Sequence, residues 1–436
     1  MADIRPFKGL RYNPSLDSSL GDLLCPPYDV ISNELQDQLY KLSPHNAIRL
    51  EFGKISNADS DQDNRYTRAS SLLDEWIENG VLLQESYDSF YLIQEIFVNQ
   101  EESITRLSLL ATVKLEEFSE RVVLPHEETS TGPKLDRMEL LSTTKTNLSP
   151  IMSIYRDNSG SIRGIMEKTL QSSPMSQANY QGTNISVWEI SDRSDTDTII
   201  NSFQDAPVYL ADGHHRYETA LSYKAARHKD PIPEKDSDKN IEPFNFVMMS
   251  LIEIDDPGLL VLPYHRALRG MTDNHMEVIM TLLYENFDLT AKIEIGRNKN
   301  SMELIQHQLE QLPADSPAIC LLESSTKTAH IMTLKPYLVD ESPLSRCTTQ
   351  VLGKRILEPV FETQQKAVEN QILHFTHNAE EVEDLLLTSD YQLGFILPQL
   401  TLDLFEEVVL AGFRMPLKST YFIPKLPSGL VMNKLG

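Results

Sequence analysis

Residues 207–220 read PVYLADGHHRYETA, and this stretch decides the fold that we expect. A short apolar strand at 208–210 meets an Asp-Gly turn, and a helix follows at once, to about Arg227. Strands that pass through tight turns into helices are the building units of mixed α/β proteins. Backbone N–H groups at the start of a helix have no partners within the helix and lie at the positive end of its dipole. The stretch therefore predicts an α/β core and, at the turn, a site for an anion.

The side chains of this turn suit a bound phosphate. Asp212 is predicted to be the N-cap, with its carboxylate accepting from the first helical turn. Gly213 lets the backbone approach a ligand closely. His214, His215 and Arg216 add donors where a phosphate would lie, and Arg216 can bind it with two parallel hydrogen bonds. Because two histidines and an arginine cost helix propensity in a first turn, we favour a functional role over capping alone.

A second polar cluster lies earlier in the chain. Glu127 follows a short predicted strand at 122–124, and a carboxylate at the end of a strand can serve as a general base. His126 precedes it, and Lys134 and Arg137 can clamp anionic oxygens. Taken alone, the run 125–128 is also typical of a solvated loop. The polar residues that complete the cluster are Asn147 and Ser149.

The rest of the chain alternates between strand and helix patterns, which predicts a mixed α/β (α+β) fold. Predicted strands lie at 89–98, 106–114, 151–155, 185–190 and 244–253, and predicted helices at 67–79, 135–146, 162–172 and 196–203. Residues 228–242 carry two prolines and many charges, which predicts a surface loop. We expect three parts: an extension at 1–85 that packs on the core, a core at 86–271, and an α/β domain with a closing tail at 272–436.

Composition limits the classes of function. The 436 residues are 40% hydrophobic and 24% charged, the balance of a folded globular protein. No run approaches the roughly 18 apolar residues that cross a bilayer, and residues 1–6 lack the pattern of a signal peptide, so we expect a cytoplasmic protein with no membrane partner. The net charge of −25, with no basic block, argues against a nucleic-acid partner. Cys25, Cys320 and Cys347 lie far apart and are interpreted as reduced thiols.

Seven segments in order resemble the bacterial and archaeal domain-of-unknown-function family 1015, over nearly the whole chain. That family name implies no activity. The matching segments are 4–7, 26–30, 124–127, 147–151, 211–220, 262–266 and 418–422.

The run Asp-Gly-His-His-Arg at 212–216 also resembles the motif of free serine kinases, which have a ParB/sulfiredoxin-like fold. This resemblance implies such a core, in which 212–216 hold the phosphates of ATP or ADP together with Mg²⁺. It implies that Glu127 takes the proton from the hydroxyl of a small substrate, with free L-serine the first choice, as the phosphoryl group moves. The predicted catalytic residues are Glu127, Asp212 and His215. The predicted binding residues are His126, Lys134, Arg137, Asn147, Ser149, Gly213, His214 and Arg216.

Two other functions stay open. Neutral histidines and a carboxylate at 126, 127, 214 and 215 suit a transition metal, which would indicate a metal-dependent hydrolase of a phosphorylated small molecule. A nucleotide-binding regulator of the ParB type would bind without turnover. Sulfiredoxins carry a reactive cysteine where this chain has His214, so we do not expect a cysteine nucleophile. The sequence leaves the oligomeric state open.

Overall fold

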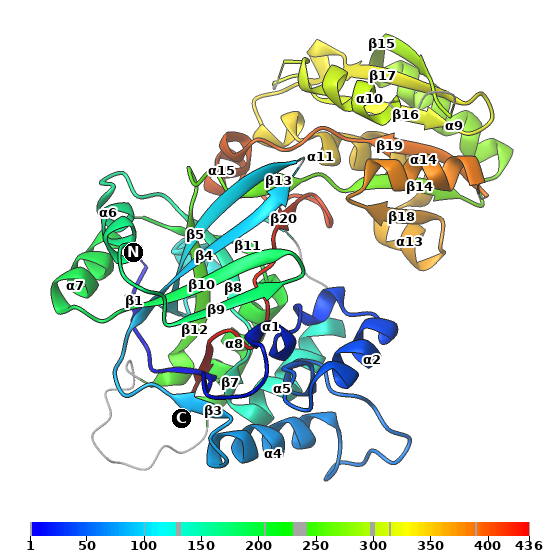
Figure 1. Ribbon diagram of the computed structural model, residues 1–436. Coiled ribbons are helices and arrows are strands. Elements are labelled where there is room, and N and C mark those ends of the chain that lie inside the picture. Colours follow the sequence, from blue (N-terminus) through cyan, green and yellow to red (C-terminus); the bar gives the residue numbers. More distant parts are fainter. Residues whose placement is uncertain are drawn as a thin grey trace. The chain divides into compact units, whose positions relative to one another are not determined.

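The computed structural model describes residues 2–99, 101–127, 132–204, 206–229, 242–296, 301–313, 315–388 and 390–435. The chain divides into two compact units, each with its own sheets and helices (Figure 1). The first unit comprises Met1–Pro125, Thr129–Leu260 and Pro424–Gly436, and the second comprises His126–Glu128 and Val261–Ile423. The prediction of a mixed α/β fold is confirmed. The division into parts at 1–85, 86–271 and 272–436 stays a prediction.

The first unit is built on a mixed sheet, which has nine strands among the described residues. Eight of them run in the order β6-β11-β8-β12-β5-β4-β10-β9, and β1 pairs with β5. Most neighbours are antiparallel, but β11 runs parallel to β6, and β12 runs parallel to β8. The strands are β1 (Ile4–Arg5), β4 (Phe90–Asn99), β5 (Glu102–Lys114), β6 (Val123–Pro125), β8 (Ile151–Tyr155), β9 (Ser176–Tyr180), β10 (Thr183–Ile190), β11 (Val208–Asp212) and β12 (Phe246–Glu253).

Helices of the first unit bury one apolar face each. The helix α4 begins two residues earlier than predicted because Asn64 forms a capping box with Thr67. It packs on α5, which in turn packs on α8 (Figure 1). The helices are α1 (Leu20–Leu23), α2 (Asn33–Leu42), α3 (Ile48–Glu51), α4 (Arg65–Glu78), α5 (Gly132–Thr144), α6 (Ser161–Thr169), α7 (Arg193–Ser202) and α8 (His214–Arg227), with 3-10 turns at Tyr28–Val30 (η1), Phe118–Glu120 (η2) and Pro243–Asn245 (η3).

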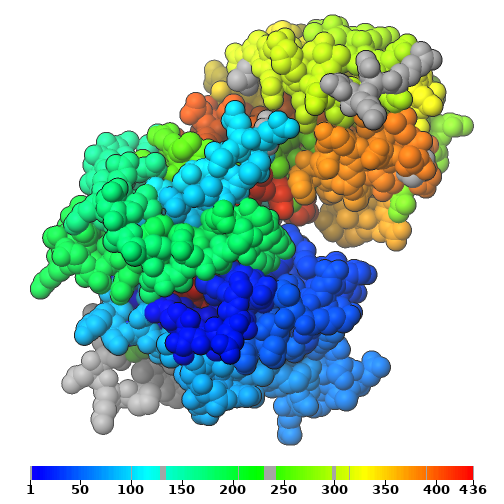
Figure 2. All heavy atoms as spheres, in the orientation of Figure 1, coloured from blue at the N-terminus to red at the C-terminus, as the bar shows by residue number. Residues whose placement is uncertain are grey.

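A second, four-stranded sheet in the first unit joins both ends of the described chain. Its order is β3-β2-β21-β7, so β21, close to the C-terminus, lies between two earlier strands. The strands are β2 (Gly9–Tyr12), β3 (Leu82–Gln84), β7 (Thr146–Asn147) and β21 (Met432–Lys434). In Figure 2 the blue N-terminal residues lie against green residues of the first unit, and α1 contacts β9 there. The N-terminal residues are therefore part of this unit's packing.

The second unit has its own sheet, six-stranded among the described residues, in the order β15-β17-β16-β19-β14-β18. Its strands are β14 (His265–Arg269), β15 (Phe287–Glu294), β16 (Ala318–Glu323), β17 (Thr328–Leu334), β18 (Leu373–Thr376) and β19 (Tyr391–Ile396), while β13 (Leu260–Leu262) and β20 (Tyr421–Ile423) form a separate pair. Its helices are α9 (Asp273–Asn286), α10 (Ser301–Glu310), α11 (Thr348–Leu352), α12 (Glu358–Phe361), α13 (Gln364–Glu369), α14 (Ala379–Thr388) and α15 (Leu402–Leu410), with shorter turns η4 (Pro336–Leu338), η5 (Pro343–Arg346) and η6 (Gly353–Leu357).

One predicted segment lies largely outside the described residues. Most of the predicted surface loop at 228–242 falls on 230–241, which lie outside the described residues. Over the described ranges, no helix combines the length and the apolar character needed to span a membrane.

Burial of His265 makes the second unit sensitive to acid. The imidazole on β14 is almost fully buried, and its Nδ1 accepts a hydrogen bond from the backbone N–H of Leu397 at 3.1 Å. Burial, reinforced by the charges of Arg266 and His377, lowers the pKa of His265 to about 3. Because the unfolded chain takes up this proton near pH 6.5, the neutral histidine stabilises the fold above that pH, and the stabilisation is lost as the pH falls toward 3.

We expect acidification from pH 7 to pH 4 to lower the free energy of unfolding by up to about 3 kcal/mol through His265. Urea unfolding followed by circular dichroism at both pH values measures this loss. His265→Asn offers an acceptor that does not titrate, so its stability should fall less over the same range. Equal losses in the wild type and the variant would contradict the assignment.

Candidate functional site

The turn between β11 and α8 has a different capping residue from the one predicted. Asp212 is the last residue of β11, and Gly213, with φ 94°, is the N-cap of α8. The prediction that Asp212 is the N-cap is therefore wrong. The physical reason is that its carboxylate has two cationic partners instead: Arg216 Nη2 lies 2.8 Å from Oδ2, and Lys425 Nζ lies 2.8 Å from Oδ1.

Only glycine suits position 213. Its positive φ lies in the left-handed region that side chains rarely adopt. A Cβ atom there would also lie 2.9–3.1 Å from three guanidinium atoms of Arg216. The guanidinium thus packs against bare backbone at the start of α8. The close approach of a ligand to Gly213 stays a prediction.

Arg216 is the most connected residue of the site. Its Nη1 donates to Ser149 Oγ at 3.0 Å and to the carbonyl oxygen of Pro150 at 2.6 Å, in addition to the contact of Nη2 with Asp212. The side chain is 11% exposed. Its buried Nε–H finds no acceptor among the residues that the structure describes. A buried donor without an acceptor costs about 1–3 kcal/mol, so this atom marks a place where an acceptor would be favourable.

Lys425 is a site residue that the sequence patterns did not indicate. It lies 11% exposed in the C-terminal segment, and its Nζ contacts both Asp212 and Asp29. Burial opposes ionisation of Asp212, but Lys425 and then Arg216 outweigh it, and the pKa of Asp212 falls well below its ordinary value. Burial likewise opposes the charge of Lys425, yet the two carboxylates raise its pKa above the ordinary value. Asp212 and Lys425 are therefore both charged at neutral pH.

The two histidines of the turn differ in burial. His214 is buried, and His215 is half-buried. Burial lowers the pKa of His215, although Glu218 opposes the shift, so its imidazole is neutral at pH 7. His215 can then accept or donate a hydrogen bond without adding charge.

The two predicted anion clamps on α5 are already paired with carboxylates. Lys134 forms an ion pair with Glu218. Arg137 donates to Glu51 Oε1 at 3.0 Å and to Asp136 Oδ2 at 2.5 Å, and it stacks 4.1 Å from the centre of the Tyr28 ring. These contacts within the first unit offset the free-energy cost of burying the Arg137 guanidinium. That Arg137 binds anionic oxygens of a ligand stays a prediction.

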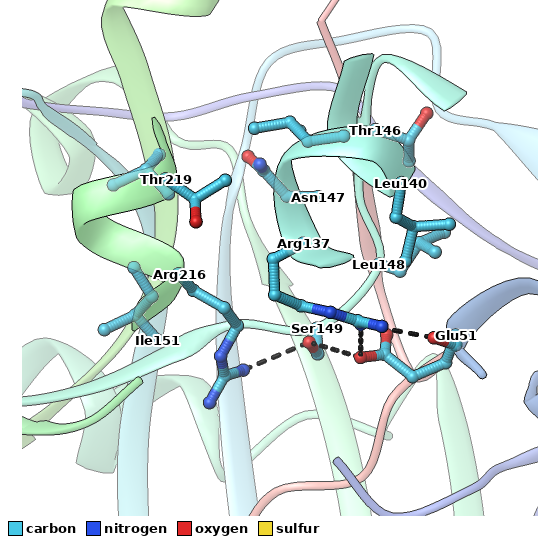
Figure 3. Close-up of a pocket in the computed structure, with 12 residues that line it drawn as sticks. Glu51, Arg137, Leu140, Thr146, Asn147, Leu148, Ser149, Ile151, Arg216 and Thr219 are labelled. Atoms are coloured by element: carbon cyan, nitrogen blue, oxygen red, sulfur yellow. Dashed lines mark hydrogen bonds and ion pairs between the residues drawn. The ribbon is translucent and has the colours of Figure 1, made fainter. Parts of the chain in front are cut away.

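A cavity of about 50 Å³ brings four of the predicted binding residues together (Figure 3). They are joined through Glu51: Arg216 donates to Ser149, whose Oγ lies 3.5 Å from Glu51 Oε1, which also accepts from Arg137. Asn147 lines the same cavity, but its Oδ1 accepts from the backbone N–H of Met248. A second, smaller cavity of about 10 Å³ is also lined by Arg216. Its other lining residues include Asp212, Lys425 and Ser250.

His126 and Glu127 belong to the second unit, where the segment 415–422 holds them. His126 is 1% exposed, its Nε2 lies 2.8 Å from Thr420 Oγ1, and its ring meets those of Phe405 and Phe422 edge-on. Glu127 Oε1 accepts from the backbone N–H of Lys418 at 3.3 Å. The neighbouring residues 128 and 129 lie outside the described residues. That Glu127 faces the Arg216 turn stays a prediction.

Comparison with known proteins identifies the family. A family model described as "Protein of unknown function (DUF1015)" matches residues 4–359. The chain belongs to the DUF1015 family. The resemblance seen in the sequence is thereby confirmed, and the last matching segment, 418–422, lies beyond the matched range. No curated protein matches this DUF1015 chain.

Solved structures resemble it only distantly. A conserved hypothetical protein from Pyrococcus furiosus is 14% identical with a TM-score of 0.35, over 72% of this chain and 92% of that one. A free serine kinase in complex with AMP is 13% identical with a TM-score of 0.35, over 70% and 85%. SbnI with a C-terminal truncation, from Staphylococcus aureus, is 13% identical with a TM-score of 0.33, over 72% and 82%. At these scores the likeness says nothing of what the DUF1015 protein binds.

The acidic residues of the site bear on the expected Mg²⁺. Within the described part of the chain, no group of three or more His, Cys, Asp or Glu residues is placed to hold a metal ion. Mg²⁺ often needs only one or two carboxylates when phosphate oxygens complete its shell. Both carboxylate oxygens of Asp212 are already paired with cations, Oδ2 with Arg216 and Oδ1 with Lys425. The use of Mg²⁺ by this DUF1015 protein stays a prediction.

Proposed function

We propose that this DUF1015 protein is a nucleotide-dependent kinase of a small hydroxyl compound, with free L-serine the first choice. One observation carries the proposal: two cations from distant parts of the chain, Arg216 and Lys425, meet at Asp212 beside the glycine turn that opens α8. Arginine and lysine at a helix start are the donors that phosphate groups prefer. The likeness of 212–216 to the serine kinase motif supports the same assignment.

Charge balance indicates why Mg²⁺ would be needed. Arg216 and Lys425 are matched by the carboxylates of Asp212 and Asp29, so the site has no surplus positive charge for a polyphosphate. Mg²⁺ bound with the nucleotide supplies that charge and neutralises the phosphate oxygens. Asp212 holds the two cations in place, and the neutral His215 can orient a phosphate oxygen.

Glu127 is the proposed base. It would take the proton from the substrate hydroxyl while the phosphoryl group moves to that oxygen. The backbone N–H of Lys418 donates to one carboxylate oxygen, and the other lies 3.8 Å from His126 Nε2, so two contacts within the second unit orient the carboxylate. We further propose that residues 86–271 form a ParB/sulfiredoxin-like core and that the protein acts in the cytoplasm on small molecules, without a nucleic-acid partner.

The assay combines the full chain with Mg²⁺, ATP or ADP, and L-serine, and follows O-phosphoserine by ³¹P NMR. We expect product, and we expect Glu127→Gln to lower kcat by at least about 100-fold with nucleotide affinity unchanged. L-alanine, which lacks the hydroxyl, is the matched control. Absence of product from every hydroxyl compound, together with no nucleotide binding by calorimetry, would defeat the proposal. Full activity of Glu127→Gln would remove Glu127 as the base.

A further inference from the structure

Thr219 on α8 carries a buried hydroxyl without a hydrogen-bond partner. The residue is 3% exposed, and its Oγ1 contacts no donor or acceptor among the described residues. Helical threonines commonly donate to the carbonyl four residues earlier, as Thr143 and Thr144 do on α5. Thr219 does not satisfy itself in this way. Its hydroxyl is therefore available to a group that enters the neighbouring cavity.

Thr219 and Arg216, whose buried Nε–H also lacks a partner among the described residues, line the same cavity. The two residues are three positions apart on α8 and share one face of the helix. Figure 3 shows Thr219 and Arg216 on one wall, with Arg137 and Glu51 across the cavity. Two buried polar groups that lack partners thus border one space, which is unusual in a folded protein.

The size and lining of the cavity limit what it can hold. A volume of about 50 Å³ limits the occupant to a compact molecule. The lining offers both signs of charge, from Glu51, Arg137 and Arg216, and the hydroxyl of Ser149. Apolar side chains complete the wall and suit a short carbon skeleton; they are Leu140, Leu141, Leu148, Ile151 and Val247.

We propose that this cavity binds a small free amino acid, whose carboxylate accepts from Arg216 Nε and whose ammonium donates to Thr219 Oγ1. An α-amino acid carries this acceptor and this donor two bonds apart, and its net charge of zero suits a lining that carries both signs. The proposal rests on the proposed function, because it places the phosphate acceptor beside the phosphate site. Arg216 then contacts both substrates, through Nε on one side and through its other nitrogens on the other.

Binding without nucleotide tests the cavity apart from the kinase activity. Calorimetry on the full chain with L-serine, glycine and L-leucine is expected to detect the two small amino acids and not L-leucine, whose side chain exceeds the space. Thr219→Val, which keeps the shape and removes the hydroxyl, should weaken L-serine binding at least about tenfold. Thr219→Ser keeps the hydroxyl and should bind like the wild type. Because the hydroxyl has no bond in this structure, Thr219→Val is expected to fold with unchanged thermal stability.

The outcomes separate the two proposals. L-serine binding that depends on Thr219, without product from any hydroxyl compound and without nucleotide binding, would support the cavity and defeat the proposed function. If the kinase assay succeeds, Thr219→Val should raise KM for L-serine with kcat and nucleotide affinity nearly unchanged. Equal L-serine affinity in the wild type and Thr219→Val would overturn the cavity proposal. So would the absence of binding by every small amino acid, which would indicate that the cavity holds water only.

Discussion

Replacing Arg216 with methionine is expected to weaken nucleotide binding about 100-fold and to abolish phosphoryl transfer. The guanidinium donates to Ser149, Pro150 and Asp212 within the first unit, so a phosphate bound beside it meets a cation that is already held in place. Its second Nη2 hydrogen is the donor left for a phosphate, and a charge-assisted hydrogen bond is worth up to about 3 kcal/mol, which corresponds to about 100-fold in affinity. Calorimetry with Mg²⁺-ADP measures the loss directly.

The same variant also tests the ion pair with Asp212. Methionine leaves a mostly buried carboxylate with Lys425 as its remaining ion-pair partner among the described residues, and breaking such a pair costs about 3 kcal/mol of unfolding free energy. Arg216→Lys keeps the charge but not the planar fork, so we expect intermediate affinity. The double variant Arg216→Met with Asp212→Asn should regain stability without regaining nucleotide binding. Wild-type ADP affinity in Arg216→Met would remove Arg216 from the phosphate site.

Replacing Lys425 with methionine is expected to destabilise the first unit by about 2–3 kcal/mol at pH 7. Its ammonium lies between Asp29 and Asp212, and without it the two carboxylates repel each other with Arg216 alone to compensate. Trp76 and Trp188, the two tryptophans of the chain, both lie in the first unit, so their fluorescence during urea unfolding reports on this unit.

The pH dependence of the Lys425 variant has a defined sign. The ionised Asp212 stabilises the fold above its unfolded pKa of about 4, and this contribution is lost as the pH falls below that value. Lys425→Met should therefore lose less stability than the wild type between pH 5 and pH 3. Adding Asp29→Asn removes the repulsion and should restore part of the stability at pH 7. A variant as stable as the wild type would show that the ammonium makes no net contribution.

Local patterns predicted local structure well. The strand, turn and helix at 208–227 are present because apolar alternation and the Asp-Gly pair act over a few residues. The strand at 151–155 agrees for the same reason. Strand β15 was not predicted, because it lies at a sheet edge and buries only Phe287 fully, so its sequence lacks a clear apolar pattern.

Contacts between distant segments were not predictable in this way. The Asp-Gly pattern indicates that Asp212 caps the helix, but its carboxylate pairs with Lys425 instead. The two residues are so far apart in the sequence that no local pattern connects them. Glu51 has no role in the sequence patterns, and only the fold places it against Arg137 and Ser149. Thr219 reads as an ordinary helical residue, and its unpartnered hydroxyl is visible only once its surroundings are known. The ParB-like core and the functional roles of the site stay proposals.

The chain returns to the first unit after it has formed the second unit, and this order affects how the protein folds during biosynthesis. Lys425 and the strand β21 come after the whole of 261–423, yet β21 lies between β2 and β7, and Lys425 completes the charges around Asp212. A ribosome must therefore translate the entire inserted unit before the first one can close its small sheet. Until residues 424–434 leave the exit tunnel, the nascent chain carries Asp29 and Asp212 without their shared ammonium. The charge network around Asp212 is thus completed at the end of translation rather than domain by domain.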